Sequence, residues 1–305
     1  MTRRRLPSWA PLAATLTLVV GCAGGVDPVT GELLGALGSA LGAPVAVAAG
    51  ARAAADQPDA ASGYQLHALY VLPRDGVDRG LDTDGTLGRS IGAFEAWFAG
   101  QTGGKQRLRV DRTAAGAVDV SCVRLDETDA QLRTHGATQR DAIEAALKRK
   151  GWTEPKKLYL VYYEGTHGTA CGDGPHPPGL PGNAVVLYLK AVPAGARPCD
   201  DNGWTPDGAK MTYREQSMIH EVLHALGFTP ACAPHQTRGG HTSIDPTDIM
   251  YAGDQPWRPT RLDVAGEIYG HGRAGCLDLA KSAFLEPAAA DAAPPPRWER
   301  AVTSR

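Results

Sequence analysis

Runs of apolar and β-branched residues, each bounded by turn-forming residues, predict the strands of this chain. The clearest are YQLHALYVLP (64–73), VDVSCVRL (118–125), KKLYLVYYEG (156–165) and NAVVLYLK (183–190). A shorter segment, KQRLRVD (105–111), alternates polar and apolar positions and predicts another strand. That strand either lines the edge of a substrate cleft, where an extended peptide adds to it, or is purely structural.

Apolar residues at helical spacing predict helices between these strands. One such pattern spans 87–103, and the second half of 129–151 predicts a helix that Gly151 ends. RLDVAGEIYG (261–270) predicts a short helix in a C-terminal part that otherwise has few strong patterns. This order of elements predicts an α+β fold with an α/β-like N-terminal part, a twisted mixed sheet and a coil-rich C-terminal subdomain.

The segment TYREQSMIHEVLHALGF (212–228) predicts an amphipathic helix with chemistry on its polar side. At 100° per residue its apolar face is formed by Ile219, Val222, Leu223 and Leu226. The opposite side gathers Ser217, His220, Glu221 and His224. Gly227 is placed to end the helix, because glycine readily takes a left-handed conformation. Histidines that merely filled a core would not need to share this second face.

The residues HEVLH (220–224) predict a zinc site. Two neutral imidazoles one helical turn apart can bind the same Zn²⁺, and the carboxylate of Glu221 is placed to reach a water that the metal activates. The five-residue pattern alone is only moderately specific, and buried structural histidines are the alternative. Because the pattern lies on the polar face of an amphipathic helix, we expect His220 and His224 to be metal ligands.

Beyond the helix, HEVLHALGF followed by DIMY (248–251) resembles the metzincin zinc metallopeptidases, and the wider likeness is to a bacterial lipoprotein branch of them. It covers most of residues 64–286, including GDQPW, RLD and CLDLAKSAFLEP. The resemblance implies a metzincin-like zincin fold and makes Met250 the methionine turn. Three residues after Gly227, where the clan places its third ligand, this chain has Pro230, which cannot ligate.

The third ligand must therefore come from a longer loop. By the resemblance we expect His241, the histidine closest before the methionine turn, with His235 as the alternative. Asp245 or Asp248 could ligate instead, although aspartates beside Pro and Thr more often cap turns. Glu267 would be the ligand of a gluzincin, a reading that leaves DIMY unexplained.

These residues predict zinc-dependent hydrolysis of peptide bonds by a metal-activated water, with Glu221 as the catalytic base and an endopeptidase the expected activity. Tyr251 is a candidate for contacting the oxyanion or the substrate, although packing is its other possible role. A zinc-containing binding or adhesion module with little turnover is the alternative function, and a structural lipoprotein without metal is a third. The intact Glu221 favours the enzyme.

The N-terminus predicts export. Arg3, Arg4 and Arg5 precede the apolar run WAPLAATLTLVV, which is too short to span a bilayer, and VVGC then resembles a bacterial lipobox. We therefore expect residues 1–22 to be a signal peptide, with Cys22 lipidated and the protein anchored on the outer face of the membrane; secretion is the alternative. Residues 23–62 predict a flexible linker, 63–287 the metallopeptidase-like domain and 288–305 a disordered tail.

Composition narrows the partners. A net charge of −2 over 305 residues offers no basic footprint for nucleic acid. From the predicted zinc chemistry we expect a peptide or protein substrate, and we expect a monomer. In an exported protein disulfides are permitted. We predict the pairs Cys171–Cys199 and Cys232–Cys276, each bracketing one loop-rich region, and leave Cys122 as a buried small apolar side chain.

Overall fold

The computed structural model describes residues 52–175, 182–191, 199, 203–205 and 210–295. Its centre is a five-stranded sheet in the order β3-β1-β4-β6-β5. The strands are β1 (Gln65–Leu72), β3 (Val120–Arg124), β4 (Lys157–Tyr163), β5 (Gly172–Asp173) and β6 (Ala184–Tyr188). β3, β1, β4 and β6 are parallel, and β5 runs antiparallel to β6 at the edge, so the sheet is mixed as predicted.

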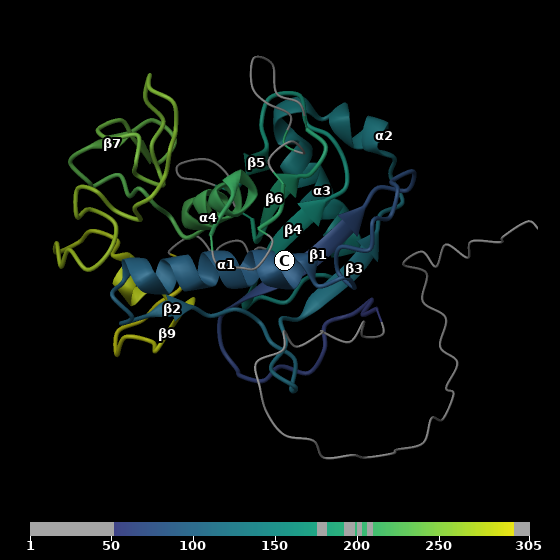
Figure 1. Cartoon of the computed structure of the whole chain (residues 1–305), viewed down its shortest axis with the longest axis horizontal. Helices are drawn as coiled ribbons and strands as arrows, with labels where there is room; N and C mark the ends of the chain where they lie inside the picture. Colours follow the sequence, from purple (N-terminus) through teal and green to yellow (C-terminus); the bar gives the residue numbers. More distant parts are fainter. Residues whose placement is uncertain (1–51, 176–181, 192–198, 200–202, 206–209, 296–305) are drawn as a thin grey trace, which may run out of the picture.

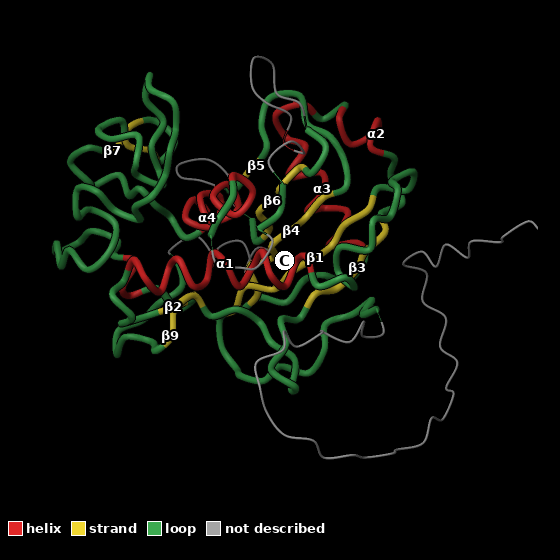
Figure 2. The backbone as a smooth tube through the Cα atoms, viewed as in Figure 1, coloured by secondary structure: helices red, strands yellow, loops and turns green. Residues whose placement is uncertain are grey.

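Helices cover both faces of this sheet. α1 (Thr86–Gln101) and α4 (Tyr213–Ala225) pack on one face, in a core that includes Tyr70, Leu160 and Leu187. α2 (Asp129–Arg133) and α3 (Gln139–Arg149) lie over the other, against Leu69, Val161 and Val186. Successive residues of each strand thus alternate between two cores, which is why the predicted strands are apolar throughout. Figure 2 shows the helices around the strands.

The C-terminal part is mostly coil and turns, as predicted. It contributes the short strands β7 (Gln236–Thr237), β8 (His241–Thr242) and β9 (Leu285–Glu286), and a 3-10 helix at Leu279–Lys281. A second 3-10 helix, Gly136–Thr138, precedes α3. In Figure 1 the segment that carries β7 forms a lobe beside the C-terminal end of α4. The fold class is therefore confirmed: a mixed sheet, a helix that carries HEVLH, and a coil-rich C-terminal subdomain.

Two predicted elements differ in the structure. Within 105–111 only β2 (Arg107–Leu108) forms, and it pairs with β9 rather than lining a cleft, so the structural alternative holds. Residues 261–270 contain no helix. There the Asp263 carboxylate accepts the backbone N–H groups of Glu267, Ile268 and Tyr269 at 2.8–2.9 Å. An aspartate that satisfies these donors itself favours a turn over a helix.

Both predicted disulfides are present, Cys171–Cys199 and Cys232–Cys276. Cys122 is buried, with 2% of its surface exposed, but it is disulfide-bonded as well. The expectation that it is a lone apolar thiol is therefore wrong. Cys171–Cys199 joins the loop before β5 to the segment after β6, and Cys232–Cys276 joins two loops of the C-terminal subdomain.

The N-terminal end of the described chain is held by charge. Arg52 forms ion pairs with Asp78 and Asp82, and the ammonium of Lys157 contacts Asp56 and Asp59 at 2.7–2.8 Å. Residues 52–62 of the predicted linker thus lie against the domain. The predicted signal peptide, Cys22, the remainder of the linker and residues 296–305 of the predicted tail lie outside the described residues.

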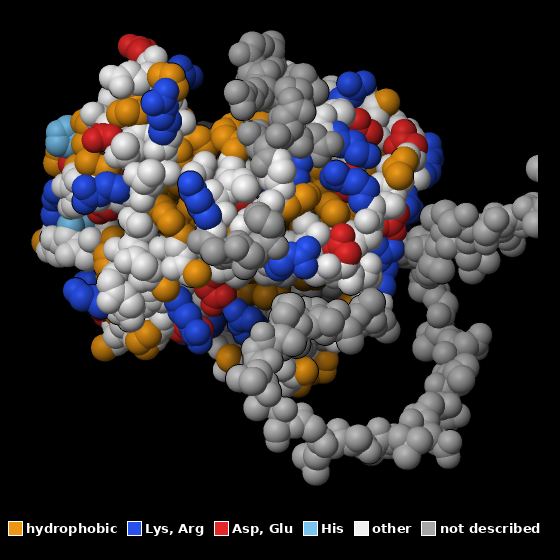
Figure 3. Space-filling model, in the orientation of Figure 1, with side chains coloured by type: hydrophobic (Ala, Val, Ile, Leu, Met, Phe, Trp, Pro, Cys, Tyr) orange, Lys and Arg blue, Asp and Glu red, His pale blue; other side chains and the backbone are white. Residues whose placement is uncertain are grey.

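On the face shown in Figure 3, charges of both signs are interspersed among the described residues. Among the described residues, no helix has the length and apolar character needed to span a membrane.

Candidate metal centre

α4 is fixed at both ends by its own sequence. The Glu215 carboxylate reaches back to accept the Thr212 backbone N–H at 2.7 Å, and it also accepts the Ser90 hydroxyl at 2.7 Å. At the other end Gly227 takes φ +96°, a left-handed conformation that glycine adopts without strain. The predicted apolar face, from Ile219 to Leu226, is fully buried. The polar face of the helix is thereby aimed at the space between the sheet edge and the C-terminal subdomain.

Three histidine side chains meet in that space. His220 and His224 come from α4, and His241 comes from β8, so the structure brings together the two helical histidines and the expected third one. The ring centroids of His220 and His241 are 5.2 Å apart, and those of His224 and His241 are 4.5 Å apart. One ring nitrogen of each residue lies within 4.8 Å of the others.

Backbone carbonyls orient all three rings in the same way. The Nδ1–H of His220 donates to Ile249 O at 2.7 Å, that of His224 to Phe228 O at 3.2 Å, and that of His241 to Arg238 O at 3.2 Å. A carbonyl only accepts, so each contact requires the proton on Nδ1 and leaves a lone pair on Nε2. Backbone carbonyls on the outer nitrogen are the usual partners of metal-binding histidines.

The inward Nε2 atoms fit a zinc ion. His224 Nε2 and His241 Nε2 are 3.1 Å apart. Two nitrogens about 2.0–2.1 Å from one tetrahedral Zn²⁺ lie roughly 3.3 Å from each other. When Nδ1 is protonated on both rings, both Nε2 atoms carry lone pairs and neither has a proton to donate. They cannot form a hydrogen bond with each other, but a cation between them would be attracted to both lone pairs. Three imidazoles and one open position are the donor set of a catalytic zinc site.

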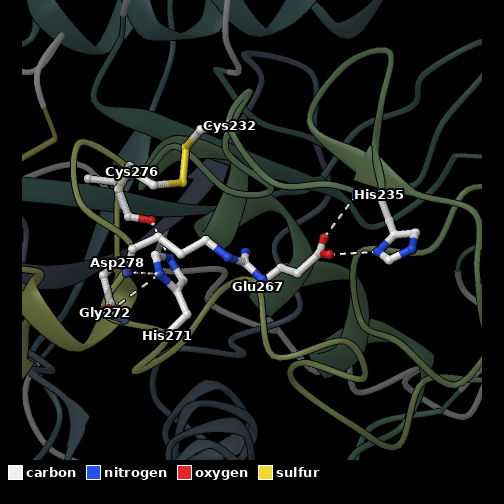
Figure 4. The surroundings of a disulfide bond; sticks show 9 residues. Cys232, His235, Glu267, His271, Gly272, Cys276 and Asp278 are labelled. Carbon is white, nitrogen blue, oxygen red and sulfur yellow. Dashed lines mark hydrogen bonds and ion pairs between the residues drawn. A yellow bond between two sulfur atoms is a disulfide. The ribbon is translucent and has the colours of Figure 1, made fainter.

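The alternative third ligands have other partners. His235 Nδ1 lies 2.6 Å from Glu267 Oε1, and its backbone N–H donates to Glu267 Oε2 at 3.1 Å. Figure 4 shows this pair beside the Cys232–Cys276 disulfide. Because His235 and Glu267 bind each other, the geometry supports neither the His235 alternative nor the gluzincin reading. Asp245 caps a turn by accepting the Thr247 N–H at 2.8 Å, as aspartates near Pro and Thr commonly do.

The predicted methionine turn is a tightly bonded loop next to the histidines. Met250 is fully buried. Its carbonyl accepts the N–H of Thr242, the residue that follows His241, at 3.0 Å. Asp248 accepts the N–H groups of Met250 and Val264 at 2.8 and 2.9 Å, and burial raises the pKa of its carboxyl to about 6. The turn therefore sets both the Ile249 carbonyl that holds His220 and the strand that presents His241.

Glu221 is half-buried beneath the edge strand β5. Its carboxylate accepts a hydrogen bond from the Gly174 backbone. Burial, and then the nearby Asp173 carboxylate, raise the pKa of Glu221 well above its usual range, which the Gly174 hydrogen bond and Arg140 only partly offset. A carboxyl with a raised pKa holds a proton more readily, which suits a group that takes a proton and later returns it.

An open cleft of about 500 Å³ joins these groups. Its walls are formed by Thr169, Ala170, Cys171, Gly172, Tyr213, Ser217, His220, Glu221, His241, Tyr251, Ala252 and Trp257. It lies between the sheet edge at β5 and the C-terminal subdomain, with α4 along one wall. Tyr251 lines it, but its hydroxyl accepts the Gln255 N–H at 3.0 Å and only 6% of the residue is exposed. That partner favours the packing role for Tyr251.

Sequence reasoning missed two parts of this site. β5 is only two residues long and lies in a Gly/Pro-rich loop without periodicity, so no pattern marks it as the rim of the cleft. Trp257 belongs to GDQPW (253–257), which only the family resemblance distinguishes from the rest of the C-terminal part. The glycines on either side of Asp173 were the available signal for β5. Glycine in a strand often marks a close approach to another group, and here Gly172 and Gly174 pass close to Glu221.

Gly172 tests the placement of Glu221. A methyl group at Gly172 would lie 2.8 Å from Glu221 Cγ and Oε1, so Gly172→Ala is expected to displace the carboxylate. Because the carboxylate ends a flexible side chain, the melting temperature and metal content should change little while turnover falls up to about 100-fold. Gly168→Ala is the matched control, since nothing lies within 4 Å of its added methyl. Equal turnover in the two variants would contradict this placement.

No protein-family model and no curated protein matches the sequence. Solved structures with similarity include OgpA from Akkermansia muciniphila, at 16% identity and a TM-score of 0.41, covering 74% of this chain and 63% of that one. Archaemetzincin from Methanopyrus kandleri is similar at 13% identity and a TM-score of 0.31, covering 62% of this chain and 82% of that one.

A third similar structure is metalloproteinase-II from Bacteroides fragilis, at 13% identity and a TM-score of 0.32, covering 72% of this chain and 55% of that one. The chain thus spans less than two thirds of the OgpA and Bacteroides fragilis chains. At these identities and TM-scores the likenesses carry no conclusion about activity.

Proposed function

We propose that this protein is a zinc metallopeptidase of the metzincin type that hydrolyses peptide bonds within a polypeptide. One observation carries the proposal: three histidines with Nδ1 tied to backbone carbonyls direct their remaining nitrogens to one point beside Glu221. HEVLH, the resemblance of DIMY to a methionine turn, and the cleft that opens on this point support it. A module that only bound zinc would not require the Glu221 carboxylate beside the three histidines in that cleft.

The residues divide the work. His220, His224 and His241 would hold the zinc ion, which when bound supplies Lewis acidity and makes a water molecule more acidic. Glu221, aimed by Gly174 and Gly172, accepts the proton from the attacking water and returns it to the leaving amine. Gly172 of β5 lines the cleft, so a peptide substrate that enters the cleft contacts this edge strand of the sheet.

Metal removal tests the proposal directly. We expect the purified protein to bind one Zn²⁺ and to cleave members of a broad peptide library. Treatment with a chelator should abolish cleavage, because the three histidines alone cannot activate water, and added Zn²⁺ should restore it. Mass spectrometry of the digests measures the loss and the recovery of cleavage, and metal analysis of the purified protein measures the bound zinc. Stoichiometric zinc without any cleavage would instead support the binding-module alternative, and absence of zinc would refute both.

We also propose that the chain is exported. Its disulfides suit an oxidising compartment, and its first residues resemble a lipoprotein signal. Lipid anchoring at Cys22 would place the cleft at the outer face of the membrane, and secretion is the alternative. Mass analysis of the mature N-terminal peptide distinguishes lipid anchoring at Cys22 from secretion without a lipid.

A further inference from the structure

Trp257 joins the methionine turn, His220 and the N-terminal end of α4. Its indole Nε1–H donates to Ile249 O at 3.2 Å and to Asp248 O at 3.3 Å. The ring meets His220 edge-on, with centroids 5.6 Å apart, and meets Tyr213 in the same way at 5.6 Å. Trp257 therefore contacts a predicted metal ligand and, independently, the carbonyl that orients it.

The carbonyl of Ile249 is shared by His220 and Trp257. Ile249 O accepts the His220 Nδ1–H at 2.7 Å, the shortest of the three histidine–carbonyl contacts, and accepts Trp257 Nε1–H as well. A carbonyl oxygen has two lone pairs, so the two donors need not compete for one. The indole fixes the direction of the carbonyl, and the carbonyl fixes the tautomer and tilt of His220.

Trp257 is itself firmly placed. The residues that follow it hydrogen-bond back to the loop before the turn, Arg258 N–H to Pro246 O and Thr260 N–H to Thr247 O, both at 2.9 Å. Gln216 on α4 donates to the neighbouring Pro259 O at 3.2 Å. The indole therefore bridges elements that are already anchored, and it packs against the His220 ring.

We propose that Trp257 is a positioning residue, which holds His220 in the ring orientation and tautomer that bind the metal. This rests on the proposed function only in taking the three histidines as ligands. Removing the indole N–H should loosen the carbonyl, and removing the whole ring should also free the imidazole to rotate. Metal affinity should fall stepwise, because groups behind metal ligands are typically worth about 10- to 100-fold in affinity.

The experiment compares Trp257→Phe and Trp257→Leu with wild type. Trp257→Phe keeps an aromatic ring beside His220 and Tyr213 but lacks the donor, whereas Trp257→Leu lacks both. Trp152→Phe is the control, since Trp152 stacks on His67 near the amino ends of β1 and β4 and does not line the cleft that contains His220 and His241. Zn²⁺ and Co²⁺ affinities are measured on metal-free protein by chelator competition, together with the Co²⁺ absorption spectrum and the melting temperature of the metal-free form.

We expect Trp257→Phe to bind metal several-fold more weakly and Trp257→Leu about 10- to 100-fold more weakly, with altered Co²⁺ spectra, while Trp152→Phe matches wild type. Affinities and spectra of both Trp257 variants equal to wild type would overturn the proposal, as would a loss explained fully by a lower melting temperature. Wild type that binds metal but cleaves nothing would refute the peptidase while leaving this test intact. Wild type that binds no metal would overturn both.

Discussion

His241→Ala is expected to abolish stable zinc binding and, with it, peptide cleavage. With His241 removed, only the two α4 histidines remain, one turn apart, and two imidazoles do not complete a catalytic site. Because even the hydrogen-bond partners of ligands are worth about 10- to 100-fold in metal affinity, loss of the ligand itself should weaken binding by more than about 100-fold. Metal content after dialysis and chelator competition measure this loss.

His235→Ala is the matched control for that prediction. It removes a histidine from the same loop, but one that contacts Glu267 and is half-exposed, with 52% of its side chain accessible. We expect it to keep full metal content and turnover, although the melting temperature falls because the buried Glu267 carboxylate loses one of its partners. If instead His235→Ala lost the metal and His241→Ala kept it, the alternative ligand would be correct.

The contrast between these histidines shows where sequence reasoning stops. His220, Glu221 and His224 could be predicted because a helix turns local spacing into a shared face. His241 reaches the site only because β8 pairs with the methionine turn, Thr242 exchanging hydrogen bonds with Met250 and Ala252 at 3.0 and 2.8 Å. That pairing is non-local, so only the resemblance to a known family singled out His241 from His235.

The fold divides in the same way. The buried strands and α1, α3 and α4 follow from apolar runs and helical spacing, which are properties of each segment alone. The short helix expected at 261–270 does not form, because the side chain of Asp263 takes the backbone donors that the helix would use. β5 and the indole of Trp257 contribute to the site through contacts with segments distant in the sequence, and no local sequence pattern predicts those contacts.

Glu221→Gln should separate metal binding from chemistry. Glutamine keeps the size of the side chain and can still accept the hydrogen bond from Gly174, so zinc content and melting temperature should stay close to those of wild type. An amide cannot take up the proton of the attacking water, however, and removing a general base typically costs about 10²- to 10⁴-fold in rate. Initial rates on one fluorogenic peptide, normalised to bound zinc, measure the effect.

Two comparisons sharpen that result. Glu221→Asp keeps an ionisable group but withdraws it by one methylene, and should recover part of the lost rate because the proton acceptor is misplaced rather than absent. Gly172→Ala, which displaces the carboxylate from outside, should resemble Glu221→Asp more than Glu221→Gln. Full turnover by zinc-loaded Glu221→Gln would rule out the base role. The water would then have to lose its proton to another group that lines the cleft.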